Sequence, residues 1–357
     1  MKVLFASLSR IGDYIQHMVL VQAWQKAHPD VEVHVLVNDL IPVDLLKMNA
    51  QYKHFILPRF EYQKRINHAA TPLIYPFLSL KKIVHQLRSE HYTLLFDLSL
   101  QHHSAELLKL IDDTFSYTET EKSVVNEYLN RKDQTHLIDK LKKIYDIELT
   151  PKSALSSKTH RILFQLTTSD MKKNIDLARW RPIVDSLKFR FPWIEISILG
   201  AKSERNLLQS VFKPSDILIC DFSHLGRILD SGTRLISLDT SIKHFAALFH
   251  VPTIEISVGS SHWIKNAAYQ AGNIIFSADF HCRPCGHSSE CPYGRNRCQD
   301  EINFDHLQDV LFKWVTNTNV INYPIKTMVR DGSLGVHSQI FRGEKWKQKT
   351  SQINLSY

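Results

Sequence analysis

DTSIKHFAALFHVPT, at residues 239–253, shows how the second half of this chain is built. The apolar run before it predicts a buried strand that ends in a polar turn. A short apolar helix follows, and Val251 and Pro252 open the next strand. A helix that joins two strands in this way is typical of a parallel sheet. The first N–H groups of the helix would face an anion, so we expect a phosphate-bearing ligand here.

The same alternation of strands and helices runs along all 357 residues. In the first half, strands are predicted at 2–7, 32–37, 54–57 and 93–98, and helices near 13–28, 76–90, 103–112 and 135–147. In the second half, strands are predicted at 160–166, 194–199, 216–220, 234–238 and 252–257, and helices near 179–190, 202–212, 223–230, 241–249 and 304–316. The predicted fold class is therefore α/β, with parallel, doubly wound sheets.

A chain of this length suits two domains of about 150 to 180 residues each. The segment 148–158 is polar, contains Pro151 and lacks periodicity, so we place the linker there. We expect one domain over residues 1–157, a second over 158–325 and a tail over 326–357. Two such domains facing each other would bind ligands at the carboxyl ends of their strands.

The charge balance favours an anionic partner. The chain has 44 lysine and arginine residues against 36 acidic ones, a formal charge of +8. Nucleic acid, phospholipid headgroups and a phosphorylated glycan all fit this charge, but no nucleic-acid-binding motif is present, so we expect no nucleic-acid partner. Because the N-terminus begins with a strand pattern and no apolar run is long enough for a membrane span, we expect a cytoplasmic protein.

Two basic segments could make a peripheral contact with the inner membrane. Arg59, Lys64 and Arg65 follow a predicted strand, and the tail carries Arg342 and Lys345 beside Trp346. Each segment also has a plainer interpretation, which is a solvated face for the first and disorder for the tail.

Four cysteines, Cys282, Cys285, Cys291 and Cys298, lie close together in the sequence with the spacing C-x2-C-x5-C-x6-C. In a reducing cytosol such a cluster favours a metal site over disulfides. The first pair has the spacing with which two thiolates share one ion. We therefore expect a small finger over residues 281–298 that holds a structural Zn or Fe. The alternatives are a loop of cysteines without metal and a site in which His281 or His287 replaces one thiolate.

Glycine is scarce, with 11 residues, and no Gly-x-Gly occurs. This excludes the common dinucleotide fingerprint and the Walker phosphate loop. A diphosphate would instead be held by helix N-termini, hydroxyl groups and a few cations. Thr168 and Lys173 follow one predicted strand, and Thr240 and Ser241 follow another, so these residues are the candidates for that role.

Several short motifs together resemble glycosyltransferase family 9, the heptosyltransferases. Residues 7–13, SLSRIGD, resemble the family's opening S-x-L-G-D, and residues 96–105 resemble its D-x-Q-G-x-x-K-S-A stretch without the glycine. Lys173 precedes Trp180 at the spacing of the family's phosphate-binding lysine. Residues 239–244 resemble D-T-G-x-x-H, with Ser241 in place of the glycine, and the cysteine cluster resembles C-x-P-C…C-P-x-G…C. The matches keep the family's order from residue 7 to residue 298.

The resemblance implies a GT-B fold, with an N-terminal Rossmann-like domain for the acceptor and a C-terminal one for the nucleotide sugar. It implies transfer of heptose from ADP-heptose to the lipopolysaccharide inner core, with inversion and without a catalytic metal or other required cofactor. Asp13 would be the general base; its alternative role is the N-cap of the first helix. The donor diphosphate would be bound by residues of the second half, namely Lys173, Thr168, Asp239, Thr240, Ser241, His244 and Gly259.

Some of these roles have structural alternatives. Asp239 would orient backbone amides or a sugar hydroxyl, or would cap a helix. His244 would donate a hydrogen bond to a phosphate, or would be a core histidine whose hydrogen bonds are satisfied within the protein. Arg59, Lys64, Arg65 and Asp97 are the candidates for acceptor binding.

Two other functions stay open. Some family relatives heptosylate serines of surface autotransporter proteins instead of a glycolipid. A function of another class is a non-catalytic metal-finger module that binds a partner on a degenerate GT-B scaffold, since two of the motifs lack a glycine.

Overall fold

The computed structural model describes residues 1–58, 77–129, 135–150, 154, 157–260, 265–270, 272–277, 285, 291, 293–294, 296–300, 302–316 and 339–342. The chain divides into two compact units. The N-terminal unit comprises Met1–Asp133 and Leu137–Leu149, and the C-terminal unit comprises Gln134–His136 and Thr150–Tyr357. The division after Leu149 lies in the polar segment 148–158, and a short piece of the first half, Gln134–His136, belongs to the second unit.

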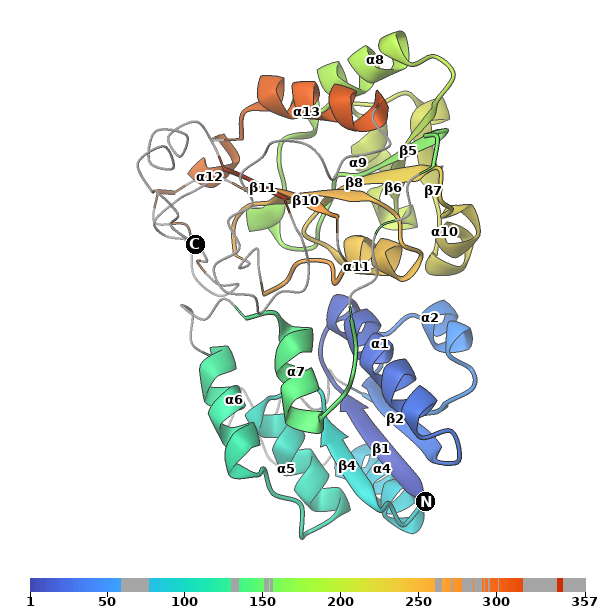
Figure 1. The fold of residues 1–357 in the computed structure, drawn as a ribbon, viewed down its shortest axis with the longest axis vertical. Coiled ribbons are helices and arrows are strands. Elements are labelled where there is room, and N and C mark those ends of the chain that lie inside the picture. The colour runs from blue at the N-terminus through green and yellow to red at the C-terminus, as the bar shows by residue number, and fades with distance from the viewer. Residues whose placement is uncertain are drawn as a thin grey trace. The chain divides into compact units, whose positions relative to one another are not determined.

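The N-terminal unit contains a parallel sheet with the order β3-β2-β1-β4 (Figure 1). Its strands are β1 (Lys2–Ser7), β2 (Glu32–Asn38), β3 (Lys53–Leu57) and β4 (Leu94–Asp97). Its helices are α1 (Ile11–Ala27), α2 (Val43–Met48), α4 (Phe77–Ser89), α5 (His102–Ile111), α6 (Glu119–Leu129) and α7 (Leu137–Tyr145).

Helices cover both faces of this sheet, because alternate side chains of a strand point to opposite faces. Leu4 of β1 belongs to an apolar cluster with Leu87 of α4 and Leu107 of α5. On the other face, the rings of Phe5 and Trp24 of α1 lie 5.4 Å apart. Two neighbouring residues of one strand thus hold helices on opposite sides of the sheet.

The C-terminal unit contains a second parallel sheet, with the order β11-β10-β9-β8-β5-β6-β7. Its strands are β5 (Arg161–Gln165), β6 (Glu195–Gly200), β7 (Ile217–Ile219), β8 (Thr233–Leu238), β9 (Thr253–Ser257), β10 (Ile274–Ser277) and β11 (Gln339–Arg342). Its α-helices are α8 (Arg181–Arg190), α9 (Arg205–Gln209), α10 (Phe222–Ile228), α11 (Ser241–Leu248), α12 (Arg297–Asp300) and α13 (Phe304–Thr316). The strand order reverses between β5 and β8, the point at which doubly wound sheets bind ligands.

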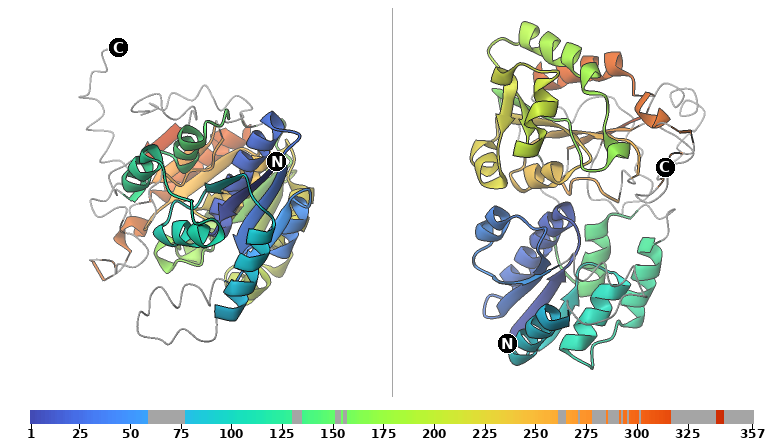
Figure 2. Two further views of the ribbon diagram at one scale, coloured as in Figure 1. Left: turned by 90° about the horizontal axis from the view of Figure 1, so that it is seen from below. Right: turned by 180° about the vertical axis from the view of Figure 1, so that it is seen from behind.

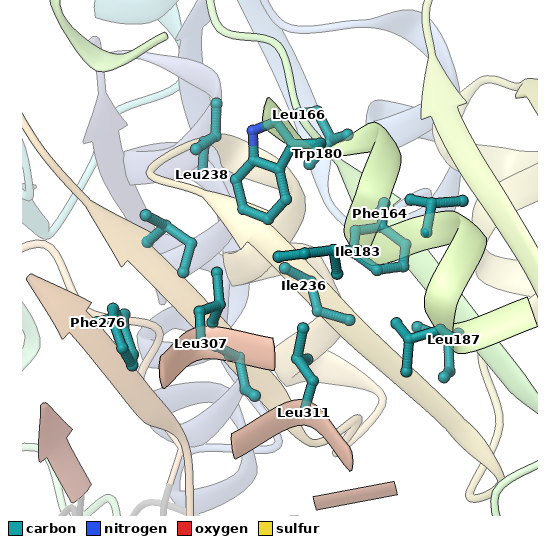
Figure 3. Close-up of a cluster of buried hydrophobic side chains, with 14 of the residues drawn as sticks. Phe164, Leu166, Trp180, Ile183, Leu187, Ile236, Leu238, Phe276, Leu307 and Leu311 are labelled. Atoms are coloured by element: carbon teal, nitrogen blue, oxygen red, sulfur yellow. The ribbon is translucent and has the colours of Figure 1, made fainter. Parts of the chain in front are cut away.

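The main apolar core lies under α8 and α13, which pack together on one side of this sheet (Figure 2, right). Trp180, Leu187 and Leu311 meet Ile236 of β8 in this layer, and all four side chains are buried (Figure 3). Outside this core, Phe222 of α10 and Phe245 of α11 pack edge to face at 4.9 Å. The helix N-terminus predicted for anion binding is therefore fixed by apolar contacts of its own.

The prediction of an α/β chain with two parallel, doubly wound sheets is confirmed. The structure adds helices and strands that periodicity did not indicate, namely α2, α6, α12, β10 and β11. The prediction of a tail without regular structure is wrong over Gln339–Arg342, which pairs with β10 in parallel. Within the described residues, every helix is too short or too polar to cross a lipid bilayer.

Candidate functional site

Four charged side chains form a chain of ion pairs that extends from the carboxyl end of β8 to the middle of β9. The Lys173 ammonium lies 2.7 Å from Oδ2 of Asp239, and the Lys243 ammonium lies 2.6 Å from Oδ1 of the same carboxylate. Lys243 Nζ also donates to Oε1 of Glu255 at 2.5 Å. No member of this chain is more than 8% exposed. The charges therefore alternate in sign along Lys173, Asp239, Lys243 and Glu255, which is how charges are tolerated away from water.

Burial and pairing act against each other on the pKa values of this ion chain. Burial alone would raise the pKa of Asp239, but Lys243 and Lys173 hold it well below its usual range. Burial alone would lower the pKa of Lys243, but Asp239 and Glu255 together raise it. Burial raises the pKa of Glu255 to about 7, against the opposing effect of Lys243. Glu255 is thus the member of the chain that changes charge near neutral pH.

Strand register brings the polar side chains together. Gln165 of β5, Ser237 of β8 and Glu255 of β9 lie opposite one another in the parallel sheet and so share one face. The Thr240 hydroxyl donates to Oε1 of Gln165 at 3.0 Å and accepts the Ile242 N–H at 3.3 Å, which makes Thr240 the N-cap of α11. The cap positions the first turn of α11 directly after the ion chain.

The loop after β5 delivers Lys173 to this site. The Thr168 N–H donates to Oδ1 of Asn174 at 2.7 Å, and the Thr168 hydroxyl donates to the Asp170 carbonyl at 2.7 Å. The Asp170 side chain caps a short 3-10 helix, Met171–Lys173, and accepts a hydrogen bond from the Ser260 hydroxyl at 2.5 Å. Thr168, predicted to bind the diphosphate, therefore already has a structural partner for its hydroxyl.

The backbone of Gly259 packs closely against the same loop, at Lys172. Its φ is +74°, and a Cβ added there would lie 2.2 Å from the carbonyl oxygen of Lys172. Only glycine allows this conformation and this close backbone approach together. Gly259 thus acts on the backbone beside Lys173.

Ser241, another candidate of the 239–244 turn, is the first residue of α11 and is partly buried, whereas His244 is buried on the same helix. The Nδ1 of His244 has no hydrogen-bond partner among the described residues. Burial, with the nearby Lys243, holds the pKa of His244 well below its ordinary value. A neutral imidazole at this place can donate one N–H to a phosphate but cannot supply a positive charge.

Asp13, the predicted base, lies in the N-terminal unit on the first turn of α1, just beyond the carboxyl end of β1. The N-cap of α1 is Arg10, so the alternative that made Asp13 the N-cap is wrong by three positions. The Asp13 carboxylate accepts the Arg10 N–H at 3.1 Å and keeps part of its surface exposed. One turn later, Nδ1 of His17 lies 2.8 Å from Oγ of Ser7, and burial lowers the pKa of His17 to about 3.

Asp97, predicted to contact the acceptor, has no exposed surface. Its carboxylate accepts the Ser99 N–H at 2.9 Å, the Ser104 hydroxyl at 2.6 Å and the Tyr117 hydroxyl. Burial raises its pKa to about 6, against these hydrogen bonds. Asp97 therefore organises the turn between β4 and α5, and its buried carboxylate offers no surface for direct contact with a ligand.

Several predicted residues cannot be placed. Arg59, Lys64, Arg65 and Cys282 lie outside the described residues, as do His281 and His287. Cys285 and Cys291 are partly buried, while Cys298 is buried on α12 at the edge of the main core. The metal finger stays a prediction.

A cluster of Glu32, His34 and Glu90 in the N-terminal unit was not anticipated. Its potential ligand atoms lie within 4.8 Å of one another. However, the Lys2 ammonium binds the Glu90 carboxylate at 2.6 Å, and Lys53 binds its other oxygen. The cluster is therefore an ion-pair network near the amino ends of the strands of the N-terminal unit. Asp13 lies at the opposite edge of the same sheet, beyond the carboxyl end of β1.

Sequence comparison gives no relatives, since no protein-family model matches the chain and no curated protein matches it significantly. Solved structures do match. Escherichia coli ADP-heptose LPS heptosyltransferase II has a TM-score of 0.62 at 14% identity, over 88% of this chain and 99% of that one. The glycosyl transferase family 9 protein of Veillonella parvula has a TM-score of 0.55 at 13% identity, over 77% of this chain and 85% of that one.

A third match is the iron-containing dodecameric glycosyltransferase TibC from enterotoxigenic E. coli. It has a TM-score of 0.52 at 10% identity, over 88% of this chain and 78% of that one. At sequence identities of 10 to 14%, the structural similarity to these proteins defines the fold of this chain alone. The fold is GT-B, the α/β architecture of two Rossmann-like units. More narrowly, it is the GT-B fold found in the family 9 heptosyltransferases, as the motifs implied.

Replacement of Gly259 by alanine should destabilise the C-terminal unit because its Cβ would meet the Lys172 carbonyl. Gly272 is the matched control, with a φ of +84° but a nearest contact of 3.6 Å for an added Cβ. In urea unfolding, both variants should lose about 1 kcal/mol for the left-handed backbone, and G259A should lose at least about 1 kcal/mol more for the clash. Equal losses would contradict the close approach.

Replacement of Asp97 by asparagine should remove a pH dependence of stability. The folded pKa of Asp97 is raised to about 6, above an unfolded value of about 3.9, so its favourable contribution is complete below about pH 4 and is lost as pH rises through about 6. Relative to D97N, the wild type should lose about 2 kcal/mol of unfolding free energy between about pH 4 and about pH 7. Parallel stability curves for the two proteins would contradict this.

Proposed function

We propose that this chain is an inverting glycosyltransferase that moves a heptose from an ADP-heptose donor to a hydroxyl of the lipopolysaccharide inner core. The observation that carries the proposal is the buried ion chain, with Lys173 at its outer end, beside the capped N-terminus of α11. This arrangement, at the switch point of a doubly wound sheet, suits a diphosphate. A GT-B fold shared with ADP-heptose-dependent enzymes supports the choice of donor.

The donor diphosphate would lie over the first turn of α11. The Ser241 N–H, together with the positive end of the helix, would bind its oxygens, while the Ile242 N–H is held by the Thr240 cap. Lys173 would neutralise the charge that grows on the leaving diphosphate as the glycosidic bond breaks. Ammonium and N–H groups would do here what a metal ion does in other transferases, so we expect catalysis to need no metal.

Asp13 would act as the general base. Inverting transfer needs a carboxylate that takes the proton from the acceptor hydroxyl while the sugar carbon passes through an oxocarbenium-like state. Asp13 combines a partly exposed carboxylate with a position fixed by the Arg10 N–H. Arg59, Lys64 and Arg65 would meet the phosphates of the acceptor, and peripheral contact with the inner membrane would bring a glycolipid to them.

The acceptor separates two versions of this function. With a glycolipid acceptor, transfer to a phosphorylated inner-core oligosaccharide should exceed transfer to a serine-rich peptide, and charge removal at Arg59, Lys64 and Arg65 should raise its KM. Serine-directed transfer predicts the opposite preference and little effect of the basic residues.

The four cysteines would form a structural metal site. A set of four thiolates fits zinc or iron, and the iron-containing TibC provides a precedent on this fold. Cys298, buried against the core, would tie the finger to the C-terminal unit. Elemental analysis of the purified protein, with Cys298→Ser as the comparison, tests for about one ion per chain.

Calorimetric titration with ADP, GDP and UDP is the decisive test of the donor site. We expect binding selective for ADP, weakened about tenfold or more in Lys173→Met because one charge contact with the diphosphate is lost. Asp13→Asn should keep ADP binding and lose at least about a hundredfold in turnover of ADP-heptose, as expected for removal of a general base. Lys188→Met, which removes a distant ion pair with Asp216 in the same unit, is the control.

Failure to bind any nucleoside diphosphate would overturn the transferase proposal. It would favour the non-catalytic module with a metal finger, in which cysteine substitutions abolish function and Asp13→Asn does not.

A further inference from the structure

Asp239 presents a physical problem for a diphosphate site. Its carboxylate directly precedes Thr240, the N-cap of α11, and so stands where the donor diphosphate of the proposed function would bind. Two anions close together in a buried site repel each other strongly. Lys173 brings one positive charge, which its ion pair with Asp239 at 2.7 Å already balances, so Lys173 alone cannot also neutralise a diphosphate.

Lys243 supplies the missing positive charge. It lies one helical turn after Asp239, and its side chain has no exposed surface. Its ammonium reaches two carboxylates, Asp239 at 2.6 Å and Glu255 at 2.5 Å. A buried lysine is costly unless it is paired, so these contacts fix where the ammonium lies.

We propose that Lys243 is a positioning residue for the donor diphosphate, which holds Asp239 in place so that Lys173 can turn its ammonium to the phosphates. Glu255 balances Lys243 until the donor binds. This inference rests on the proposed function and adds to it a residue pair, Lys243 and Glu255, that no motif indicated.

The charge count of the ion chain extends the proposal. With Glu255 ionised, two ammonium groups face two carboxylates and the chain is neutral. When Glu255 takes up a proton, the chain becomes positive by one charge and attracts a diphosphate. Donor binding should therefore draw a proton from solution onto Glu255.

The surroundings of Glu255 support this coupling. The charges that act on it are Lys243 of α11, Asp239 of the turn before α11 and Lys173 of the loop after β5. The histidines nearby, His244 and His136, are both neutral near pH 7, because burial lowers their pKa values. The change of charge near neutral pH thus belongs to Glu255, whose pKa is raised to about 7.

The experiment is a calorimetric titration of the full chain with ADP-ribose, whose diphosphate keeps its charge between about pH 6 and about pH 8. Wild-type affinity should rise as the pH falls through this range, and buffers of different ionisation enthalpy should report uptake of a proton near pH 7. Glu255→Gln should bind at about pH 8 at least as tightly as the wild type does at about pH 6, with no proton uptake.

Lys243→Met should weaken ADP-ribose binding about tenfold to a hundredfold at every pH. Without Lys243, the Asp239 carboxylate is paired with Lys173 alone and holds its ammonium away from the phosphates. The double variant Lys243→Met/Glu255→Gln removes one charge of each sign, which guards against loss of folding, and should bind as weakly as the single lysine variant. Lys188→Met is again the control and should bind like the wild type.

The outcomes separate the two proposals. Suppose that the wild type binds ADP-ribose and that Lys243→Met and Glu255→Gln both bind like it. The positioning role is then wrong, and the proposed donor site stands. The same conclusion follows if both variants weaken binding equally without a change in proton uptake. If the wild type binds neither ADP-ribose nor ADP, the proposed function itself fails, and this inference with it.

Discussion

A buried ammonium group is costly unless it is paired, and at Lys243 this constraint organises the site of the C-terminal unit. Lys243 satisfies it by contacting Asp239, which directly follows β8, and Glu255, which lies in the middle of the neighbouring strand β9. The ion pairs of Lys243 restrict the rotation of α11 about its axis. The contact of Phe245 with Phe222 of α10 restricts the same rotation. Apolar packing and ion pairing therefore agree on one rotation of α11, and its capped N-terminus follows directly after the carboxyl end of β8.

The loops at that edge are held by contacts of the same kind. Ser260 binds Asp170, Gly259 lies against the Lys172 backbone, and Thr168 closes the loop onto itself through Asn174. Lys173 is thus carried by a loop with little freedom of its own. A site built in this way loses little conformational entropy when an anion binds, which favours affinity.

Much of the fold could be predicted from the sequence, because apolar strands such as β1 and β8 and helices such as α13 show their periodicity directly. The short helix α2 and the strand β11 could not, since neither has enough residues to show a pattern. In the site, Thr240 and Asp239 were recognisable as the polar end of a strand. Lys243 and Glu255 were not, because their pairing depends on the register of β9 beside β8 and on the rotation of α11. The one available signal was a pair of charges inside otherwise apolar runs, Lys243 in α11 and Glu255 in β9.

Charged residues within apolar runs cost free energy when folding buries them, so their presence in a core needs an explanation. An apolar pair in place of Lys243 and Glu255 would satisfy the core at least as well, since buried ion pairs seldom add net stability. What an apolar pair could not do is compensate Asp239 and change the charge of the site by a proton. The same reasoning applies to Asp97, whose buried carboxylate is matched by Ser99, Ser104 and Tyr117 and which orders a turn at the carboxyl edge of the N-terminal sheet. Each unit thus has a buried carboxylate where a strand ends, Asp97 at the end of β4 and Asp239 directly after β8. Part of the electrostatic cost of the fold is therefore carried at the edges where its ligands would bind.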